Sequence, residues 1–283
     1  MNIAPQAYPY QDRMDRIVDY IYAHLDSEID LDQLAEIACL SRFHWHRTYK
    51  ALSGETLAAT VKRLRLHRAA TQLAQSKMPM DKIIEQSGYG SASAFSRAFS
   101  QMYRIPPAQY RERGTPSTFL QKLKTENDAM HKVEIRELDQ MALVGLHHKG
   151  AYMDIGIAFE KLGAWGQKQG LFGPGNASMA LYYDDPDLVP TAELRSFAGM
   201  LEIHPVELST PFERITVEPG KFAVMQFKGP YSELSTAYNW LYGTWLEGAN
   251  VELRDAPCME DYLNNPRLVA PSELLTDIFM PIK

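Results

Sequence analysis

Two arginines stand at matching positions of a motif that the sequence contains twice. The copies share a serine, an aromatic residue, an arginine and a second aromatic residue at an offset of 50 positions, as Ser41, Trp45, Arg47 and Tyr49 and then Ser91, Phe95, Arg97 and Phe99. A guanidinium holds five N–H donors in a planar fork, which suits it to bind an anion or an edge with two acceptors. The motif therefore predicts two equivalent sites of anion or acceptor recognition.

The elements that would present these arginines are helices. Apolar residues recur at helical spacing from residue 14 to 25, and Asp30 begins a capping box. Ser41 and Ser91 are good N-caps for helices that bury the aromatic residues and leave each arginine on a solvated face. Residues 57–73 contain no Pro or Gly and predict a long connecting helix. Short helix pairs on both sides of a long helix predict tandem helix-turn-helix units.

Residues 14 to 113 resemble the DNA-binding domain of the AraC/XylS transcription regulators, which carries two such units joined by a long helix. The residues that carry the resemblance are Leu34, Ala35, Ser41, Arg47, Tyr49, Lys50, Leu52, Ile83, Ile84, Gly88, Tyr89, Ser91, Phe95, Ser96, Arg97, Phe99, Pro106, Pro107, Ala108, Gln109, Tyr110 and Arg111. The resemblance implies double-stranded DNA as a partner, with RNA polymerase as a further one.

The same resemblance implies which residues read DNA. The base-reading positions are Arg42, Phe43, His46 and Arg47 in the first unit and Ala92, Ser93, Ser96 and Arg97 in the second. Arginine can read guanine O6 and N7, whereas alanine can only touch a thymine methyl. We therefore expect the first unit to supply more direct base readout and the second more phosphate anchoring. For Arg47, a base contact, a phosphate contact and an intramolecular pair are all open.

A basic run, KRLRLHR, occupies residues 62–68 inside the expected connecting helix. On a helix these charges spread around the cylinder. We therefore expect a solvated face with one or two phosphate contacts rather than a continuous stripe that follows nucleic acid.

The charge of the chain is divided along its length. The formal net charge is −6, but basic residues outnumber acidic ones in residues 1–126 and acidic residues dominate in 127–283. A basic half can attract a polyanion. The sequence shows neither a long apolar stretch nor a secretory signal, which predicts a cytoplasmic protein without membrane contact. Cys39 and Cys258 have no companion thiol at metal-ligand spacing and are expected to be buried apolar residues.

The second half changes period from helical to alternating. A linker is predicted at 114–130, because this stretch opens with Gly and Pro and ends in polar residues. Beyond it, strands are predicted in VEIREL, MALVGLHH, SMALYYDD, FERITV and FAVMQFKG, and helices in IGIAFEKLGAWGQKQ and ELSTAYNWLYGTWLE. The predicted organisation is an all-α tandem helix-turn-helix domain at 8–113, followed by an α+β domain at 131–283.

The second half also repeats itself. Lys149, Gly150 and Tyr152 return as Lys228, Gly229 and Tyr231 at an offset of 79 positions. Each copy is expected to run strand, helix, strand, strand. Two such pseudo-symmetric units would leave a concave seam between them, which is a common place for a small ligand.

This pattern, with YYDDP at 182–186, GKFAVMQFKGPY at 220–231 and ELLTDIFMPIK at 273–283, resembles the GyrI-like effector-binding domain. The resemblance implies a small, aromatic or cationic effector in the seam, held by an acidic residue among aromatic rings. Glu260 with Tyr262 beside it is the candidate, with Asp261 and Glu202 as alternatives. The other candidate ligand-binding residues are Tyr152, Trp165, Phe197, Tyr231 and Trp240. A carboxylate among rings is costly to keep charged until a cation arrives.

Three functions follow from these patterns. The first is a transcription regulator, more readily an activator than a repressor, that binds DNA with its first half and senses a small molecule with its second. The second is a hydrolase of reactive small molecules that uses Glu260 and Tyr262. The third is a protein-interaction module. No cofactor, metal site or catalytic group is expected, since His147 and His148 are strand neighbours that point to opposite faces.

Overall fold

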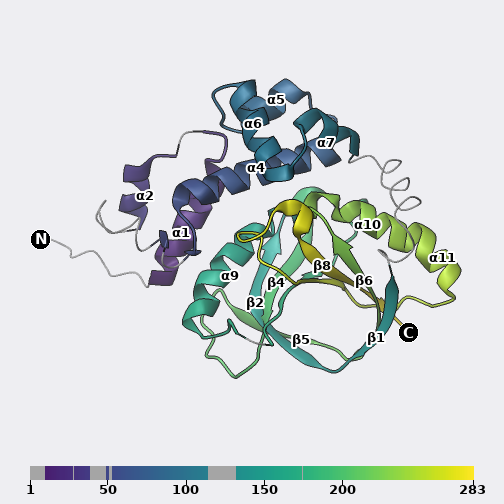
Figure 1. The fold of residues 1–283 in the computed structure, drawn as a ribbon. Coiled ribbons are helices and arrows are strands. Elements are labelled where there is room, and N and C mark those ends of the chain that lie inside the picture. The colour runs from purple at the N-terminus through teal and green to yellow at the C-terminus, as the bar shows by residue number, and fades with distance from the viewer. Residues whose placement is uncertain (1–9, 28, 39–48, 51–52, 114–131, 174) are drawn as a thin grey trace, which may run out of the picture.

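The protein consists of a helical half and a sheet half that lie against each other (Figure 1). The computed structural model describes residues 10–27, 29–38, 49–50, 53–113, 132–173 and 175–283 of the 283. The predicted first recognition helix with its cap Ser41, and the predicted linker at 114–130, lie outside the described residues.

The helical half is built on one long helix, α4. Its described helices are α1 (Tyr10–Ala23), α2 (Leu31–Ile37), α4 (Leu57–Gln75), α5 (Met80–Gln86), α6 (Ala92–Tyr103) and α7 (Pro107–Arg113). The first part of α4 contributes Leu57, Val61 and Leu64 to a core shared with α1 and α2. The second part, which includes Leu66 and Leu73, packs in a separate core with α5, α6 and α7. The predicted connecting helix is confirmed, and each of its ends belongs to a different core.

Side-chain caps set the starts of the helices where the sequence predicts them. Asp30 Oδ1 accepts a hydrogen bond from the Gln33 amide at 3.2 Å, ahead of α2. Ser91 Oγ accepts one from the Ala94 amide at 3.2 Å and begins α6. These bonds satisfy amide donors that have no partner inside the helix.

The sheet half is an antiparallel sheet with helices on one face. Its described strands run in the order β1-β6-β8-β7-β3-β4-β2-β5. Their bounds are β1 Val133–Leu138, β2 Met141–Lys149, β3 Ser178–Tyr182, β4 Arg195–Leu201, β5 Glu213–Val217, β6 Gly220–Lys228, β7 Cys258–Tyr262 and β8 Leu275–Ile282. The edge strand β1 pairs with β6, and the other edge strand β5 pairs with β2. The prediction of an α+β domain is confirmed.

The helices of this half follow β2 and β6. Helix α9 (Gly156–Lys168) follows β2 after a 3-10 turn, η2 (Tyr152–Asp154). A second 3-10 turn, η4 (Tyr231–Glu233), follows β6 and leads into α10 (Leu234–Trp240), a π-helical turn (Leu241–Trp245) and α11 (Leu246–Ala249). Further short 3-10 turns, η3 (Thr191–Glu193) and η6 (Pro271–Glu273), precede β4 and β8.

The two faces of the sheet support different cores. Ala180 and Ala198 pack on the face that carries α9, and Ile278 packs on the same face beneath α10. Phe197 and Phe279 belong to a core on the opposite face. Figure 1 shows the sheet curling around that second core while the helices lie outside it. This alternation follows from the strand period of two residues.

The helical half covers the helix-bearing side of the sheet half. Helix α1 runs against α9, where Lys161 Nζ lies 2.7 Å from Asp19 Oδ1. Helix α4 lies across η4, where Gln75 donates to the Ser232 carbonyl at 3.0 Å. The Tyr110 hydroxyl is hydrogen-bonded to the Ser232 hydroxyl at 2.6 Å. These contacts place α4 directly over the part of the sheet half where η4 begins.

None of the described helices combines the length and apolar character that crossing a membrane would require.

Candidate nucleic-acid interface and ligand site

Helix α6 presents small and basic side chains outward and aromatic ones inward. Phe95 and Phe99 are completely buried, and their rings lie 5.6 Å apart in the second helical core. The four predicted DNA-reading residues of this helix, Ala92, Ser93, Ser96 and Arg97, are all exposed. Small side chains around a guanidinium leave room for a duplex to approach. The helix therefore has the surface that the sequence predicts.

The turn before α6 depends on a glycine. Gly88 has φ +67°, in the left-handed region that disfavours other side chains. The Arg65 guanidinium lies directly against this position, and Arg65 Nη1 donates to the Gly88 carbonyl at 3.3 Å. Arg65 of α4 thus contacts and stabilises the turn that precedes α6.

The predicted reading residues of the first unit, Arg42, Phe43, His46 and Arg47, lie outside the described residues. Their roles remain predictions.

The basic run on α4 differs from the expected solvated face. Lys62 is exposed, but Arg63, Arg65 and Arg68 turn toward the protein. Arg65 Nε donates to the Leu25 carbonyl at 2.7 Å, and Arg68 Nη2 donates to the Gln86 carbonyl at 2.5 Å. These arginines cap the carbonyl ends of neighbouring segments, a role that guanidinium donors fill well. The prediction of a solvated, phosphate-contacting face was wrong for these three residues.

Arg63 joins the two halves through a buried ionic network. It lies 2.5 Å from Glu55 and 2.8 Å from Glu160 of α9. Arg267, in the segment between β7 and β8, contacts Glu160, Glu55 and the Ser53 carbonyl. Burial alone would lower the pKa of the Arg63 guanidinium, but the charges of Glu160 and Glu55 outweigh it and raise that pKa. The network balances two acids against two arginines and spans the interface.

A buried carboxylate lies at the centre of the helix-bearing face of the sheet. Glu260 of β7 is 3 % exposed, and its register partner on β3 is Ala180. Tyr262 donates to Glu260 Oε2 at 2.7 Å, and Tyr238 of α10 donates to Oε1 at 3.0 Å. Tyr182 of β3 donates to Oε2 at 3.4 Å and lies 2.8 Å from the Tyr262 hydroxyl. Among the described residues, these neutral hydroxyls are the partners of the carboxylate.

Burial sets the protonation of this cluster. Loss of water raises the pKa of Glu260, and the three tyrosine hydrogen bonds offset part of that rise. Burial and the Glu260 charge raise the pKa values of Tyr182, Tyr238 and Tyr262 well above the ordinary value of tyrosine. The tyrosines therefore stay protonated donors. Among the described residues, the hydrogen-bond partners of the carboxylate are neutral tyrosines, and no cationic side chain contributes to its pKa shift.

Aromatic rings surround the carboxylate on the side of the helical half. The Tyr231 and Tyr262 rings meet edge to face at 5.3 Å, and Phe159 of α9 meets Tyr262 at 5.2 Å. Tyr152 meets Tyr182 at 4.7 Å, and its hydroxyl donates to the Asp184 carbonyl at 2.7 Å. Of the predicted ligand-binding residues, the structure therefore brings together Glu260, Tyr262, Tyr231 and Tyr152.

The remaining predicted residues lie apart from this cluster. Trp165 is buried in the core beneath α9, where it stacks on Phe212 at 4.4 Å. Phe197 belongs to the core on the opposite face of the sheet. It is the strand neighbour of Ala198, which lies on the same face as Glu260, and adjacent strand residues point to opposite faces. Trp240 packs at the edge of the core under α10. As correction to the expectation, Trp165 and Phe197 fill the interior and do not wall the seam.

Three residues of the cluster, Tyr182, Phe159 and Tyr238, were not predicted from the sequence as ligand-binding residues. Tyr182 is the first residue of YYDDP, at the end of a predicted strand, and this position could have indicated that it belongs to the site. Phe159 and Tyr238 occupy equivalent positions of the 79-residue repeat, so the repeat itself could have indicated both. The sequence could not show that Tyr238 donates to Glu260, because the two come from different elements.

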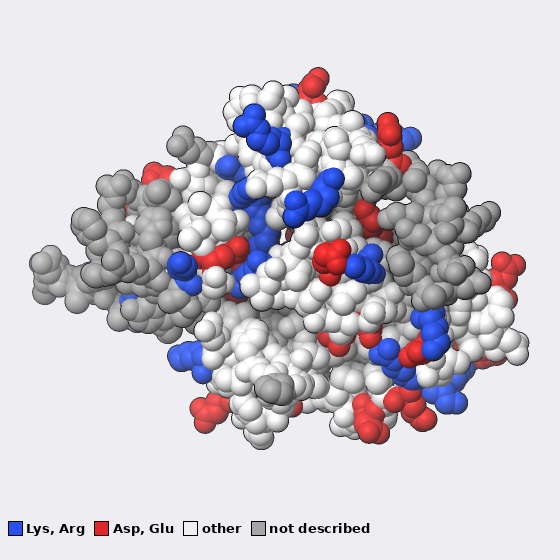
Figure 2. All heavy atoms as spheres, viewed as in Figure 1, with Lys and Arg blue, Asp and Glu red and all other residues white. Residues whose placement is uncertain are grey.

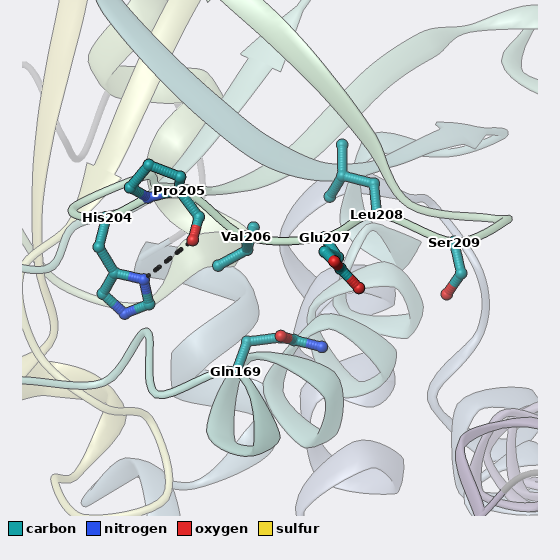
Figure 3. Close-up of a pocket in the computed structure, with 7 residues that line it drawn as sticks. All are labelled: Gln169, His204, Pro205, Val206, Glu207, Leu208 and Ser209. Atoms are coloured by element: carbon teal, nitrogen blue, oxygen red, sulfur yellow. Dashed lines mark hydrogen bonds between the residues drawn. The ribbon is translucent and has the colours of Figure 1, made fainter.

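An open depression lies elsewhere, between the end of α9 and the loop that follows β4 (Figure 3). Its volume is about 450 Å³, and its lining residues are Gln169, His204, Pro205, Val206, Glu207, Leu208 and Ser209. His204 is tied to its own loop, with Nδ1 3.4 Å from the Pro205 carbonyl (Figure 3). Within the described part of the chain, no Phe, Tyr or Trp ring and no buried charged side chain lines it. The Glu260 cluster differs from this depression, because it combines a buried carboxylate with aromatic rings.

Within the described residues, no group of three His, Cys, Asp or Glu side chains is placed to hold a metal ion. Cys258 is half-buried, and its Sγ lies 3.0 Å from the Tyr242 hydroxyl.

Residues 131–283 match the GyrI-like small molecule binding domain. The chain belongs to the GyrI-like family. Its helical half, at residues 34–113, matches a helix-turn-helix domain of the AraC type. The GyrI-like domain therefore contains the Glu260 cluster, and the helix-turn-helix domain contains α6.

The regulators that resemble this GyrI-like chain each match only part of it. The regulatory protein SoxS of Salmonella typhimurium is 27 % identical over 104 residues, which are 37 % of this chain and 97 % of SoxS. The transcriptional regulator Rob of the same organism is 31 % identical over 100 residues, 35 % of each chain. The regulator YbfP of Bacillus subtilis is 28 % identical over 125 residues, 44 % of this chain. The chain spans 40 % of YbfP, 33 % of the MmsAB operon regulatory protein of Pseudomonas aeruginosa and 38 % of LumQ of Photobacterium leiognathi.

Two solved structures that align with this chain are distant from it in sequence. The EcmrR–DNA complex aligns with 91 % of this chain and 85 % of its own, at 17 % identity and a TM-score of 0.46. SAV2435 bound to tetraphenylphosphonium aligns with 54 % of this chain and 94 % of its own, at 15 % identity and a TM-score of 0.40.

Proposed function

We propose that the protein is a DNA-binding transcription regulator whose GyrI-like domain senses a small aromatic cation. The observation that carries the proposal is the buried Glu260 carboxylate, whose partners among the described residues are neutral tyrosine hydroxyls. An anion in such surroundings is costly until a cation neutralises it. Aromatic faces nearby add an attraction for the same ligand.

The DNA-binding half of the proposal is supported by α6. Arg97 is exposed beside Ser93 and Ser96, and the buried Phe95 and Phe99 hold the helix from beneath. In Figure 2, Lys and Arg side chains gather over the middle of the helical half in this view. A basic surface of this kind would attract a duplex, and Arg97 would anchor to a phosphate or a base edge. We place the DNA-binding domain at 8–113, a linker at 114–130 and the sensing domain at 131–283.

The sensing domain is proposed to be a pseudo-symmetric pair of strand, helix, strand, strand units. The strand order supports it, because it reads as one four-strand set, β1-β6-β8-β7, followed by an equivalent set in reverse, β3-β4-β2-β5. Gly150 follows β2 and Gly229 follows the equivalent strand β6, and both have a positive φ, +131° and +155°. Glu260 breaks the symmetry, since Ala180 stands opposite it. One seam would thus hold one cation.

Regulation would run through contact with RNA polymerase in a cytoplasmic complex, and activation is the direction we propose. The AraC-type helical half supports this, since the relatives it resembles are regulators. A binding role fits the cluster better than a hydrolytic one. The Tyr262 hydroxyl donates to Glu260, and burial raises its pKa well above the ordinary value, so it is a poor nucleophile.

Measured DNA affinity tests the first half of the proposal. A duplex selected from a random pool by the wild-type protein would be titrated by fluorescence anisotropy at several salt concentrations. Arg97→Ala should weaken binding about 5- to 100-fold and reduce the salt slope by about 1 if the guanidinium meets a phosphate. Lys221→Ala, which removes an exposed charge from β6, is the matched control. Equal affinity for Arg97→Ala and wild type would contradict the assignment of α6.

Calorimetric titration with tetraphenylphosphonium, an aromatic monocation, tests the second half. The full-length protein should bind it, and Glu260→Gln should lower the affinity at least about tenfold, because the amide carries no charge. Affinity should also increase with pH as the raised pKa of Glu260 is passed and the carboxylate becomes charged. Wild type and Glu260→Gln with the same affinity would refute a cation-sensing role for this carboxylate.

A further inference from the structure

The helical half reaches the Glu260 cluster through one histidine. His67 lies on α4, and its ring centroid is 6.2 Å from that of Tyr231, in an edge-to-face arrangement. Tyr231 in turn contacts Tyr262, which donates to Glu260. A continuous line of rings thus leads from the DNA-binding half to the buried carboxylate.

One polar atom of His67, Nε2, has no hydrogen-bond partner among the described residues. Nε2 is shielded from solvent and makes no hydrogen bond to any described residue, although the residue as a whole is only half-buried. A polar atom that loses water without gaining a partner costs free energy, and native structures rarely leave one so. Such an atom, on a ring that contacts Tyr231 of the Glu260 cluster, points to a group that is supplied from outside the chain.

The charges around His67 keep this atom available. Burial, aided by the nearby Arg63 guanidinium, lowers the pKa of His67 to about 4, so the imidazole is neutral at physiological pH. Arg63 itself is held by Glu55 and Glu160. The neutral ring offers one hydrogen-bonding atom and adds no charge to that of Glu260.

The contact is firmly placed. On one side of His67, Gln75 donates to the Ser232 carbonyl at 3.0 Å, and Tyr110 is hydrogen-bonded to the Ser232 hydroxyl. On the other side, Arg63 is tied to Glu160 of α9. These bonds hold α4 over η4, so His67 lies against Tyr231 whenever the halves are in contact.

We propose that the effector site is completed by the DNA-binding half, with His67 Nε2 hydrogen-bonding a polar substituent of the aromatic cation that Glu260 binds. This inference rests on the proposed sensing function. It narrows the ligand class to aromatic monocations with a hydroxyl or amino group on a ring remote from the charge. It also makes the ligand a direct bridge between the two halves of the protein.

Two matched probes test the proposal in the full-length protein. Tetraphenylphosphonium has no hydrogen-bonding group, and (4-hydroxyphenyl)triphenylphosphonium differs from it by one hydroxyl. Wild type should bind the hydroxylated probe about fivefold more tightly, the gain expected for one buried hydrogen bond. In His67→Phe that advantage should disappear while the affinity for tetraphenylphosphonium changes less than about twofold. His67→Gln should restore part of the advantage.

Control variants separate the possible failures. His204→Phe, which alters a histidine in the open depression, should behave as wild type. If the Phe ring does not fit, as circular dichroism would show, His67→Leu takes its place. If wild type binds neither probe, the sensing function itself fails. If both probes bind and Glu260→Gln weakens both, the sensing function stands. The role of His67 is then overturned if the hydroxyl gives no advantage in wild type, or if its advantage persists in His67→Phe.

Discussion

Glu160 of α9 pairs with both arginines of the ionic network at the contact between the halves. Its side chain is 11 % exposed and lies between Arg63 at 2.8 Å and Arg267. Glu160→Gln would leave two nearly buried arginines facing each other with Glu55 as their remaining acid. Removing one partner from a buried ion pair costs about 3–5 kcal/mol, and the amide oxygen still accepts one hydrogen bond, so we expect about 3 kcal/mol.

Urea unfolding followed by tryptophan fluorescence and by circular dichroism measures this change. A loss of about 3 kcal/mol at a slope of roughly 3 kcal/mol per molar urea lowers the midpoint by about 1 M. The control is Glu85→Gln, because Glu85 lies 2.7 Å from Lys82 but both side chains are about two-thirds exposed. That pair is screened by solvent, and its loss should leave the midpoint unchanged. Equal midpoints for the two variants would refute the argument that burial makes the network strong.

Four further substitutions, one of them a comparison variant, have outcomes set by the structure. Gly145→Ala should destabilise the protein by several kcal/mol, because a Cβ there would lie 1.9 Å from the Ala198 carbonyl oxygen. Gly163→Ala on α9 meets open space and should stabilise the protein by about 1 kcal/mol. Opposite shifts of the urea midpoint in these two variants would support both expectations. Glu260→Gln should raise the thermal midpoint at pH 7 by a few degrees, since the folded state resists the charge that burial opposes; a lower midpoint would contradict this. Burial, and then the charge of Asp277 on β8, raises the pKa of Asp261 to about 6. The protonated Asp261 side chain therefore contributes stability below about pH 4, and this contribution is lost as pH rises through 6. Asp261→Asn should therefore gain stability over wild type at pH 7 but not at pH 4, as thermal melts at both pH values would show.

The helical half was largely predictable because its signals are local. Caps at Asp30 and Ser91, the glycine turn at Gly88 and the uninterrupted run of α4 each act within a few residues. The basic run on α4 was not predictable in the same way. Arg65 and Arg68 bond carbonyls of segments distant in sequence, and periodicity alone cannot show that these carbonyls lack partners.

The sheet half was predicted in outline, with three strands missing. β4 contains Gly199 and is buried on both faces, so it lacks the alternation that marks a half-buried strand. β8 is buried over almost its whole length and contains Pro281 near its end, which obscures the pattern. β7 holds two acids, Glu260 and Asp261, whose burial follows only from their neighbours in the sheet.

The candidate site shows the same limit. Resemblance located Glu260 and Tyr262, and the repeat located Tyr152 and Tyr231. Register decided the rest, because a shift of one residue sends Phe197 to the other face. The approach of His67 depends on how the halves pack, and the sequence of either half carries no signal for that contact.

Because α4 is a single 19-residue rod rooted in two cores, the helical units cannot swivel independently. On a duplex that turns once in about 10.5 base pairs, inserting one base pair between the two recognised segments would rotate them by roughly 34° relative to each other. A flexible linker could follow that rotation, but α4 would have to bend, or one unit would have to dissociate from the DNA. DNA sites recognised in the way we propose should therefore vary in sequence far more than in spacing.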